Sequence, residues 1–277
     1  MPELPEVEHV SRSLNTLVKG RRIASAHLLR ERLAPDTTPV QFAEKLGSSA
    51  INFIHRRGKH ILFDLSNERT LIVHLRMSGR FSLLSAEIEN PKFTHAVLQF
   101  GDNTRLVFDD QRHFGLMKIV DTQVLHESKE LAKLAPEPFA DDFSLSYLKA
   151  TLRSSKRSLK ELLLDQTKVC GLGNIYASEA MFAARIDPRT PANEVSAPKA
   201  ARLYAGIRGV LTEAIEHSMK KKIDPQDIEG GYFDGAADRG WLVYDREKEP
   251  CVNCKSPVLR LKQGGRSTYY CRRCQKR

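Results

Sequence analysis

The first hydrophobic pattern in the chain repeats with a helical period. Between residues 2 and 18 the apolar positions fall on one stripe, which is typical of a helix buried along one side. Three glutamates in the first eight residues suit the positive end of a helix dipole, and Gly20 is a stop signal. The residues of the stripe are Val7, Val10, Leu14 and Leu17.

Between about residues 51 and 121 the apolar residues repeat with a period of two, which is typical of β-strands. Ile61, Phe63 and Leu65 alternate with His60, Leu62 and Asp64. Two later strand-like runs are joined by residues 101–103, whose Gly-Asp-Asn sequence favours a hairpin turn. This part of the chain predicts an antiparallel β-sandwich.

A change of pattern follows the Leu-Ala-Pro-Glu-Pro-Phe run at 134–139, where two prolines interrupt regular structure. Beyond it we expect helices at about 144–153, 156–167, 174–185 and 197–219, then a polar, Gly-rich stretch. The predicted organisation is a sandwich domain over 1–133, a linker over 134–142, a helical domain over 143–240 and a Cys-rich module over 241–277.

The charge balance narrows the range of partners. The chain has 44 Lys and Arg against 34 Asp and Glu, a net charge of +10 and a pI near 9.4. Such a balance favours a polyanion such as a nucleic acid. There is no apolar run of about 18 residues to cross a bilayer and no basic leader, so we expect a cytoplasmic protein without a membrane partner.

Four of the five cysteines lie in the last 27 residues. Cys251 and Cys254 form one Cys-x2-Cys pair, and Cys271 and Cys274 form another after 16 intervening residues. This spacing predicts one structural Zn²⁺, because four thiolates complete a tetrahedron and leave no open position. The alternatives are two disulfides or four unrelated thiols. The same tail carries eight basic residues and no acidic one, which suits a DNA backbone.

The first residues carry candidate chemistry. Removal of Met1 leaves Pro2 with a secondary amine of pKa near ~8, which is a plausible neutral nucleophile. Attack on the C1′ carbon of a sugar forms an iminium, which acidifies the C2′ proton and permits strand cleavage. Glu3 and Glu6 could serve as acid and base partners at the same sugar. The alternative is ordinary capping, since proline and acidic residues are common at helix starts.

The opening Met-Pro-Glu-Leu-Pro-Glu-Val-Glu at 1–8 resembles the start of the bacterial formamidopyrimidine-DNA glycosylase family, which endonuclease VIII shares. Four further stretches are similar to family motifs: the His-Leu-x-Met-x-Gly strand at 74–79, the wedge loop at 110–115, the helix-two-turn-helix segment at 171–177, and the zinc-finger tip at 265–271. The resemblance implies an α+β multidomain fold. It consists of an N-terminal antiparallel β-sandwich flanked by helices and a C-terminal helix-two-turn-helix domain with a zinc finger.

The resemblance also assigns catalytic roles. It implies that Pro2 is the nucleophile, that Glu3 protonates the opening sugar ring, and that Glu6 helps to organise the pocket. Lys59 matches a lysine that binds phosphate and assists catalysis. From the residues alone, a solvated basic turn is the favoured interpretation of Lys59.

The resemblance implies that the remaining matched residues contact DNA. His74, Asn174 and Arg266 match residues that bind the backbone, and Asn174 is also expected to cap a helix. Met77, Arg112 and Phe114 match the residues that fill the gap left by an extruded nucleotide. Core packing is the alternative for the two apolar residues of this set, and an ordinary polar strand position is the alternative for His74.

The function implied is a bifunctional DNA glycosylase and abasic-site lyase of base excision repair. We expect it to remove formamidopyrimidines and 8-oxoguanine from double-stranded DNA by β,δ-elimination. We further expect a nucleoid-associated bacterial monomer that binds DNA across a basic cleft between its domains.

Two departures from the family leave the lesion open. Residues 220–233 lack the Thr-Leu-Arg-Asp-Tyr-like loop of enzymes that excise 8-oxoguanine, and Gln111 replaces a proline. The rival functions are an endonuclease VIII-like enzyme for oxidised pyrimidines or abasic sites, and a non-catalytic zinc-ribbon protein that binds DNA.

Overall fold

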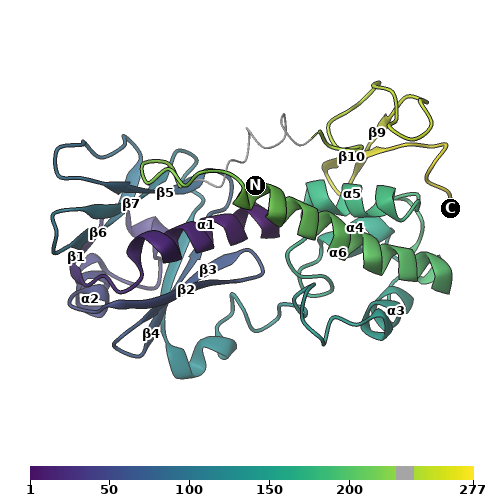
Figure 1. Ribbon diagram of the computed structural model, residues 1–277. Helices are drawn as coiled ribbons and strands as arrows, with labels where there is room; N and C mark the ends of the chain where they lie inside the picture. Colours follow the sequence, from purple (N-terminus) through teal and green to yellow (C-terminus); the bar gives the residue numbers. More distant parts are fainter. Residues whose placement is uncertain (229–239) are drawn as a thin grey trace. The chain divides into compact units, whose positions relative to one another are not determined.

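The computed structural model describes residues 1–228 and 240–277, and its chain divides into two compact units (Figure 1). The first unit contains Met1–Ala132 together with a stretch that begins at Ser218. The second contains Lys133–His217 and the C-terminal residues through Arg277. This division differs from the predicted organisation, which assigns the stretch after Ser218 to the helical domain over 143–240.

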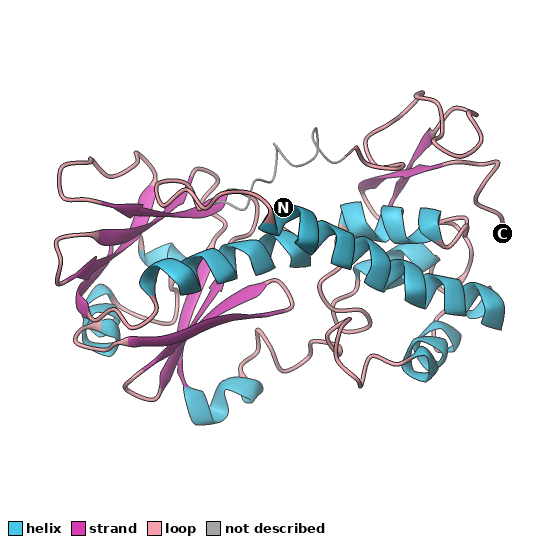
Figure 2. Ribbon diagram, in the orientation of Figure 1, coloured by secondary structure: helices cyan, strands magenta, loops and turns pink. Residues whose placement is uncertain are grey.

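The first unit is built on two four-stranded antiparallel sheets, whose strands are magenta in Figure 2. One sheet has the order β1-β6-β7-β5 and the other β2-β3-β4-β8. The predicted hairpin at 101–103 joins β6 to β7. The strand bounds are β1 Ile23–Leu28, β2 Ile51–Arg57, β3 His60–Leu65, β4 Arg69–His74, β5 Gly79–Leu84, β6 Thr94–Phe100, β7 Arg105–Asp110 and β8 Leu116–Asp121.

Both sheets contribute to one hydrophobic core, so the predicted β-sandwich is confirmed. Phe63 of β3 meets Phe81 of β5 with ring centroids 5.8 Å apart, and Phe81 meets Phe108 of β7 at 5.2 Å. The alternation expected in β3 holds only in part, because His60 and Leu62 are buried as well. His60 packs edge-on against the ring of His74 on the neighbouring strand.

Two helices flank this sandwich. Helix α1 (Leu4–Val18) fulfils the predicted pattern, and the side chains of its apolar stripe enter the same core as the strands. Helix α2 (Pro39–Leu46) was not predicted, although Thr38 and Gln41 form a capping box around its first turn. Short 3-10 turns, η1 (Glu31–Leu33) and η2 (Thr122–Glu127), complete the unit.

The stretch after Ser218 extends the sheet at its β5 edge. Ile228 exchanges backbone hydrogen bonds with Phe81, and the Leu83 N–H donates to the Pro225 carbonyl. This pairing covers an edge strand that would otherwise expose unpaired backbone groups. The part of the run 220–233 that lies beyond Ile228 falls outside the described residues.

The second unit is helical and ends in a small hairpin. Its helices are α3 (Leu145–Arg153), α4 (Leu159–Leu164), α5 (Asn174–Ala183) and α6 (Ala197–Met219), with a 3-10 turn η3 (Ala192–Glu194). Strands β9 (Leu259–Gln263) and β10 (Arg266–Tyr270) form the hairpin. Helix α4 is shorter than the predicted helix at 156–167, because Ser158 caps it at Glu161 and Asp165 ends it.

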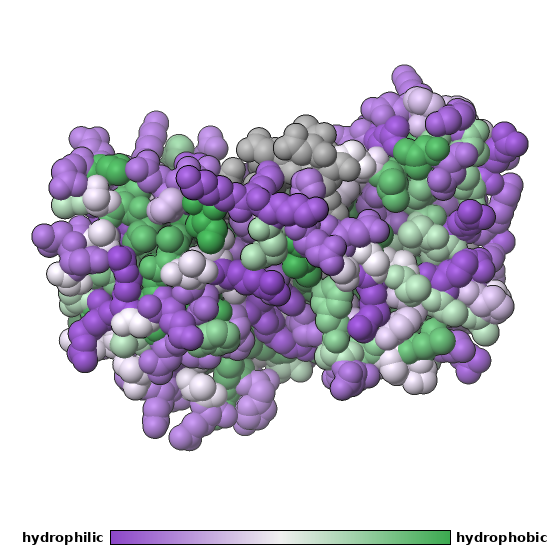
Figure 3. All heavy atoms as spheres, viewed as in Figure 1, coloured by the Kyte–Doolittle hydropathy of each residue, from purple (hydrophilic) through white to green (hydrophobic). Residues whose placement is uncertain are grey.

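The surface is polar over most of the face drawn in Figure 3, with smaller hydrophobic areas between the hydrophilic residues. Among the described residues no helix combines the length and the apolar character needed to span a bilayer.

Candidate active site and zinc centre

Pro2 and Glu3 lie buried just before α1, whereas Met1 is 41% exposed. Glu3 is the N-cap residue and is only 2% exposed, and Pro2 beside it is buried as well. The carboxylate of Glu6 accepts the backbone N–H of Glu3 at 2.9 Å. Glu6 therefore fixes the first turn of the helix through a capping box, and its role in organising a pocket stays a prediction.

The environment of the N-terminal amine favours its neutral form. Burial lowers the pKa of the Met1 amine below its ordinary value, and the positive charges of Lys59 and Arg112 lower it further. Glu3 and Glu6 oppose this change, but burial is the largest effect. The fold thus gathers Glu3, Glu6, Lys59 and Arg112 around the end of the chain.

Lys59 is buried in the tight turn between β2 and β3. The guanidinium of Arg56 braces that turn by donating to the Gly58 carbonyl at 3.0 Å. Arg56 also pairs with Glu8 of α1, with Nε and Oε2 2.8 Å apart. The helix that follows Pro2 and the turn that carries Lys59 are therefore joined by a largely buried ion pair, which the sequence patterns did not predict.

His74 ends β4 and is held as a neutral ring. Burial lowers its pKa well below the ordinary value, with smaller effects from His60, Arg76 and Lys59. The backbone N–H of Arg76 donates to His74 Nδ1 at 3.0 Å. A neutral ring that accepts at Nδ1 carries its proton on Nε2, so His74 can act as a hydrogen-bond donor.

The three predicted wedge residues lie in two turns of the first unit. Phe114 is 50% exposed, so the core-packing alternative does not apply to it. The Arg112 guanidinium lies 5.4 Å from the centre of the Phe114 ring. Met77 is half-buried in the turn between β4 and β5. An exposed aromatic ring beside a cation is a surface that can stack on nucleic-acid bases.

Asn174 and Arg266 belong to the second unit. The expectation that Asn174 caps α5 was wrong: Gly173 is the N-cap residue, and Asn174 is the first helical residue. Its side chain instead donates to the Ser267 carbonyl at 2.9 Å. Asn174 thereby ties the start of α5 to Ser267. The neighbouring residue, Arg266, is exposed.

A two-residue turn places Arg266 at the tip of the hairpin. Gln263 pairs with Arg266, and the intervening Gly264 and Gly265 have φ angles of +52° and +77°. Positive φ at both positions is what a tight hairpin turn requires, and glycine adopts it without steric cost. The Gly-Gly pair therefore sets the position of Arg266 as the first residue of β10 after the turn.

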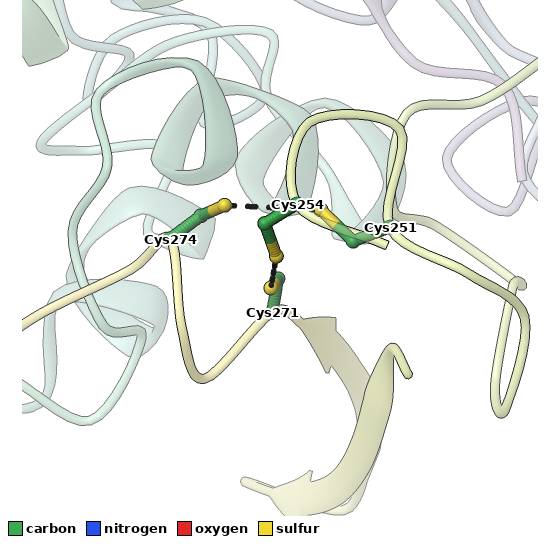
Figure 4. A group of neighbouring side chains, drawn as sticks. All are labelled: Cys251, Cys254, Cys271 and Cys274. Carbon is green, nitrogen blue, oxygen red and sulfur yellow. Dashed lines mark hydrogen bonds between the residues drawn. The ribbon is translucent and has the colours of Figure 1, made fainter. Parts of the chain in front are cut away.

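The four cysteines converge as predicted (Figure 4). All four Sγ atoms lie within 4.8 Å of one another; Cys251 and Cys274 are 3.8 Å apart, and Cys254 and Cys271 are 3.4 Å apart. A tetrahedron with Zn–S bonds of about 2.3 Å has S···S edges of about 3.8 Å, so the thiols fit a zinc ion. All four are free rather than paired in disulfides, which excludes that alternative.

The thiols have different proton affinities. Burial raises the pKa of Cys274 to about 12 and raises that of Cys271. Hydrogen bonds from Ser256 lower the pKa of Cys254 to about 6. Binding of a cation must therefore displace protons from the buried thiols, which makes the affinity for zinc fall as the pH falls.

Three family models match the chain. The formamidopyrimidine-DNA glycosylase N-terminal domain matches residues 1–117 and the H2TH domain of the same proteins matches residues 134–224. A zinc finger found in FPG and IleRS matches residues 248–277.

Similar proteins share the whole length of the chain. The formamidopyrimidine-DNA glycosylases of Ruegeria pomeroyi and Listeria innocua are 40% and 37% identical to it, with 100% of both chains covered in each comparison. Among solved structures, the Lactococcus lactis enzyme with N7-benzyl-Fapy-dG DNA has a TM-score of 0.91, 32% identity and full coverage of both chains. The same enzyme bound non-covalently to AP-site DNA has a TM-score of 0.89 and 31% identity, covering 99% of this chain and 100% of its own.

The purified protein should contain one zinc ion per chain, and a strong chelator should remove it. Trp241 is the only tryptophan and contacts Tyr244, which packs against Tyr269 of the finger, so its fluorescence should change as the metal leaves. Metal analysis of Cys254→Ser should show loss of zinc, whereas Cys170→Ser, which alters the cysteine outside the cluster, should retain it. Full zinc content in Cys254→Ser would contradict the assignment.

Proposed function

The chain belongs to the formamidopyrimidine-DNA glycosylase family, and on that premise we propose that it excises oxidised purines through a covalent intermediate at Pro2. It is a DNA glycosylase with abasic-site lyase activity that acts in base excision repair. Ring-opened formamidopyrimidines are its first substrate class, and 8-oxoguanine is the second.

The observation that carries the assignment of Pro2 is the environment of the N-terminal amine. That amine is partly buried next to the start of α1, and Lys59 and Arg112 add to the effect of burial in lowering its pKa. After removal of Met1 the amine is the Pro2 nitrogen, one residue further along, and Pro2 is itself buried. A neutral amine has the free electron pair that nucleophilic attack requires.

The covalent step begins when the electron pair of the Pro2 nitrogen bonds to C1′ of the damaged nucleotide, while the bond between C1′ and the base breaks and its electrons leave with the base. The Pro2 nitrogen then gives up its N–H proton, and the departing base takes up a proton. Glu3 donates a proton to O4′ as the C1′–O4′ bond opens, and the pair freed on nitrogen forms the second bond of an iminium between Pro2 and C1′. Lys59 binds phosphate beside this sugar.

Strand cleavage follows from the iminium. Loss of the C2′ proton sends electrons toward the positively charged nitrogen and expels the 3′ phosphate. A second elimination, with loss of the C4′ proton, expels the 5′ phosphate, and hydrolysis then frees Pro2. Each step conserves electrons without an external oxidant or reductant, because the iminium serves as the electron sink.

DNA contacts come from both units. His74 donates from Nε2 to a phosphate, and Asn174 and Arg266 hold the backbone near the lesion. Met77, Arg112 and Phe114 fill the space that the extruded nucleotide leaves in the stack, against a restacking energy of a few kcal/mol. The exposure of Phe114 supports this role.

The protein works as a monomer on the chromosome in the bacterial cytoplasm. The net charge of +10 supports association with DNA along its length, since neutralised phosphates release counterions.

A panel of duplexes tests the substrate class. Formamidopyrimidine should be excised fastest, followed by 8-oxoguanine and then thymine glycol, with nicking measured on denaturing gels beside a duplex that contains an abasic site. The endonuclease VIII-like alternative has one observation in its favour, because the Lactococcus lactis relative has also been seen with an oxidized pyrimidine containing DNA. Faster excision of thymine glycol would favour that alternative. DNA binding without nicking of any duplex would favour the non-catalytic binder.

The pH dependence of borohydride trapping tests the state of the amine. Because burial and neighbouring cations lower the amine pKa, the trapping rate on abasic DNA should rise with pH and level off, with a midpoint below the ordinary value near ~8. Lys59→Met removes a positive charge, so it should move the midpoint upward, besides any loss of rate. Lys19→Met, at the other end of α1, is the matched control and should leave the midpoint unchanged. A midpoint unmoved in Lys59→Met would contradict this electrostatic account.

A further inference from the structure

Asp110, the last residue of β7, is a completely buried carboxylate. Its Oδ2 accepts the Gly115 N–H at 2.7 Å, and its Oδ1 accepts the Arg112 N–H at 3.2 Å. The hydroxyl of Ser78 also donates to Oδ1. One side chain thus receives three donors, each from a residue that lies in or borders a turn.

These donors belong to the two turns that carry the proposed wedge residues. Ser78 directly follows Met77 between β4 and β5, and Arg112 and Gly115 flank Phe114 in the next turn. The Arg112 N–H also lies 3.0 Å from Ser78 Oγ, so the two turns touch each other as well as Asp110. Asp110 is therefore the common anchor of two segments that are far apart in sequence.

The packing around this anchor leaves little room for movement. A Cβ atom added to Gly115 would lie 2.8 Å from the Phe108 ring and 3.2 Å from Asp110 Oδ2. A Cβ atom added to Gly79 would lie 2.7 Å from the same ring. Both turns therefore lie directly on Phe108, and the Asp110 hydrogen bonds set their positions on it.

We infer that Asp110 is a positioning residue that holds Met77, Arg112 and Phe114 as one preformed wedge. This inference rests on the proposed function, because a wedge matters only to an enzyme that extrudes a nucleotide from a duplex. Asp110 does not contact the reacting sugar. It lowers the cost of opening the duplex by keeping three side chains from two turns in register before DNA binds.

Substitution by asparagine separates this role from a purely structural one. Asp110→Asn preserves the shape of the side chain but replaces one acceptor oxygen with an N–H₂ group. That group would face a donor, either the Gly115 N–H or the donors from Arg112 and Ser78. At least one of the two turns therefore loses its anchor.

Asp109 supplies a matched control on the same strand. It is also a buried carboxylate, 4% exposed, and it accepts the Phe93 N–H at 3.1 Å and Arg80 Nε at 3.2 Å. These partners do not lie in the turns that carry the wedge residues. Asp109→Asn therefore imposes a similar change on the core and leaves the anchor in place.

The experiment compares single-turnover borohydride trapping on an abasic oligonucleotide, as a single strand and as a duplex, at saturating enzyme. Only the duplex leaves a gap that a wedge must fill. In Asp110→Asn the duplex rate should fall by about tenfold or more, while the single-strand rate should stay within about twofold of wild type. Asp109→Asn should keep the wild-type ratio of the two rates. A fluorescent base analogue opposite the abasic site should report slower wedge insertion in Asp110→Asn alone.

Each outcome decides a separate point. The inference would be overturned if Asp110→Asn lost trapping rate equally on both substrates, or lost none on the duplex. It would also be overturned if the wild-type protein trapped the duplex but could not trap the single strand. If Asp110→Asn does not fold, Ser78→Ala replaces it, and a selective loss on the duplex is again expected, of smaller size because two donors to Asp110 remain. Wild-type protein that traps neither substrate would instead refute the proposed function.

Discussion

The partial burial of the N-terminal amine beside the buried Pro2 and Glu3 is the constraint on which the proposed chemistry depends. An amine in water is mostly protonated at neutral pH and cannot attack a sugar, whereas burial disfavours the charged form. Burial is available here because the apolar stripe of α1 enters the core of the sandwich and draws the first residues in with it. Packing of a hydrophobic helix and the proposed activation of Pro2 thus follow from one arrangement.

A second consequence is that groups far apart in sequence are held in register with that helix. Glu8 on α1 pairs with Arg56, which braces the turn of Lys59, and Lys59 in turn affects the pKa of the amine and of His74. In the second unit the same principle applies to DNA contacts. Zinc would fix the ends of the β9–β10 hairpin, and Asn174 ties its tip to α5. In both units a rigid element carries the side chains that we propose to act on DNA.

Local patterns predicted the parts of the structure that local forces determine. The cysteine spacing identified the zinc cluster, because each Cys-x2-Cys turn brings its two thiols together by itself. The helical stripe identified α1, and the Gly-Asp-Asn turn identified the β6–β7 hairpin. The similarity of short motifs, rather than periodicity, supplied the roles proposed for Pro2 and Lys59.

Contacts between distant residues were beyond the reach of the sequence. Asn174 opens a helix and so suggests a cap, but its side-chain amide donates to the Ser267 carbonyl, 93 residues away. Ile228 pairs with Phe81 through backbone groups, which every residue carries, so no residue type marks that edge. The most direct test of the central claim is mass spectrometric mapping of the borohydride-trapped adduct with abasic DNA. The account predicts the adduct on the Pro2 nitrogen of chains that have lost Met1, and an adduct on Lys59 would contradict it.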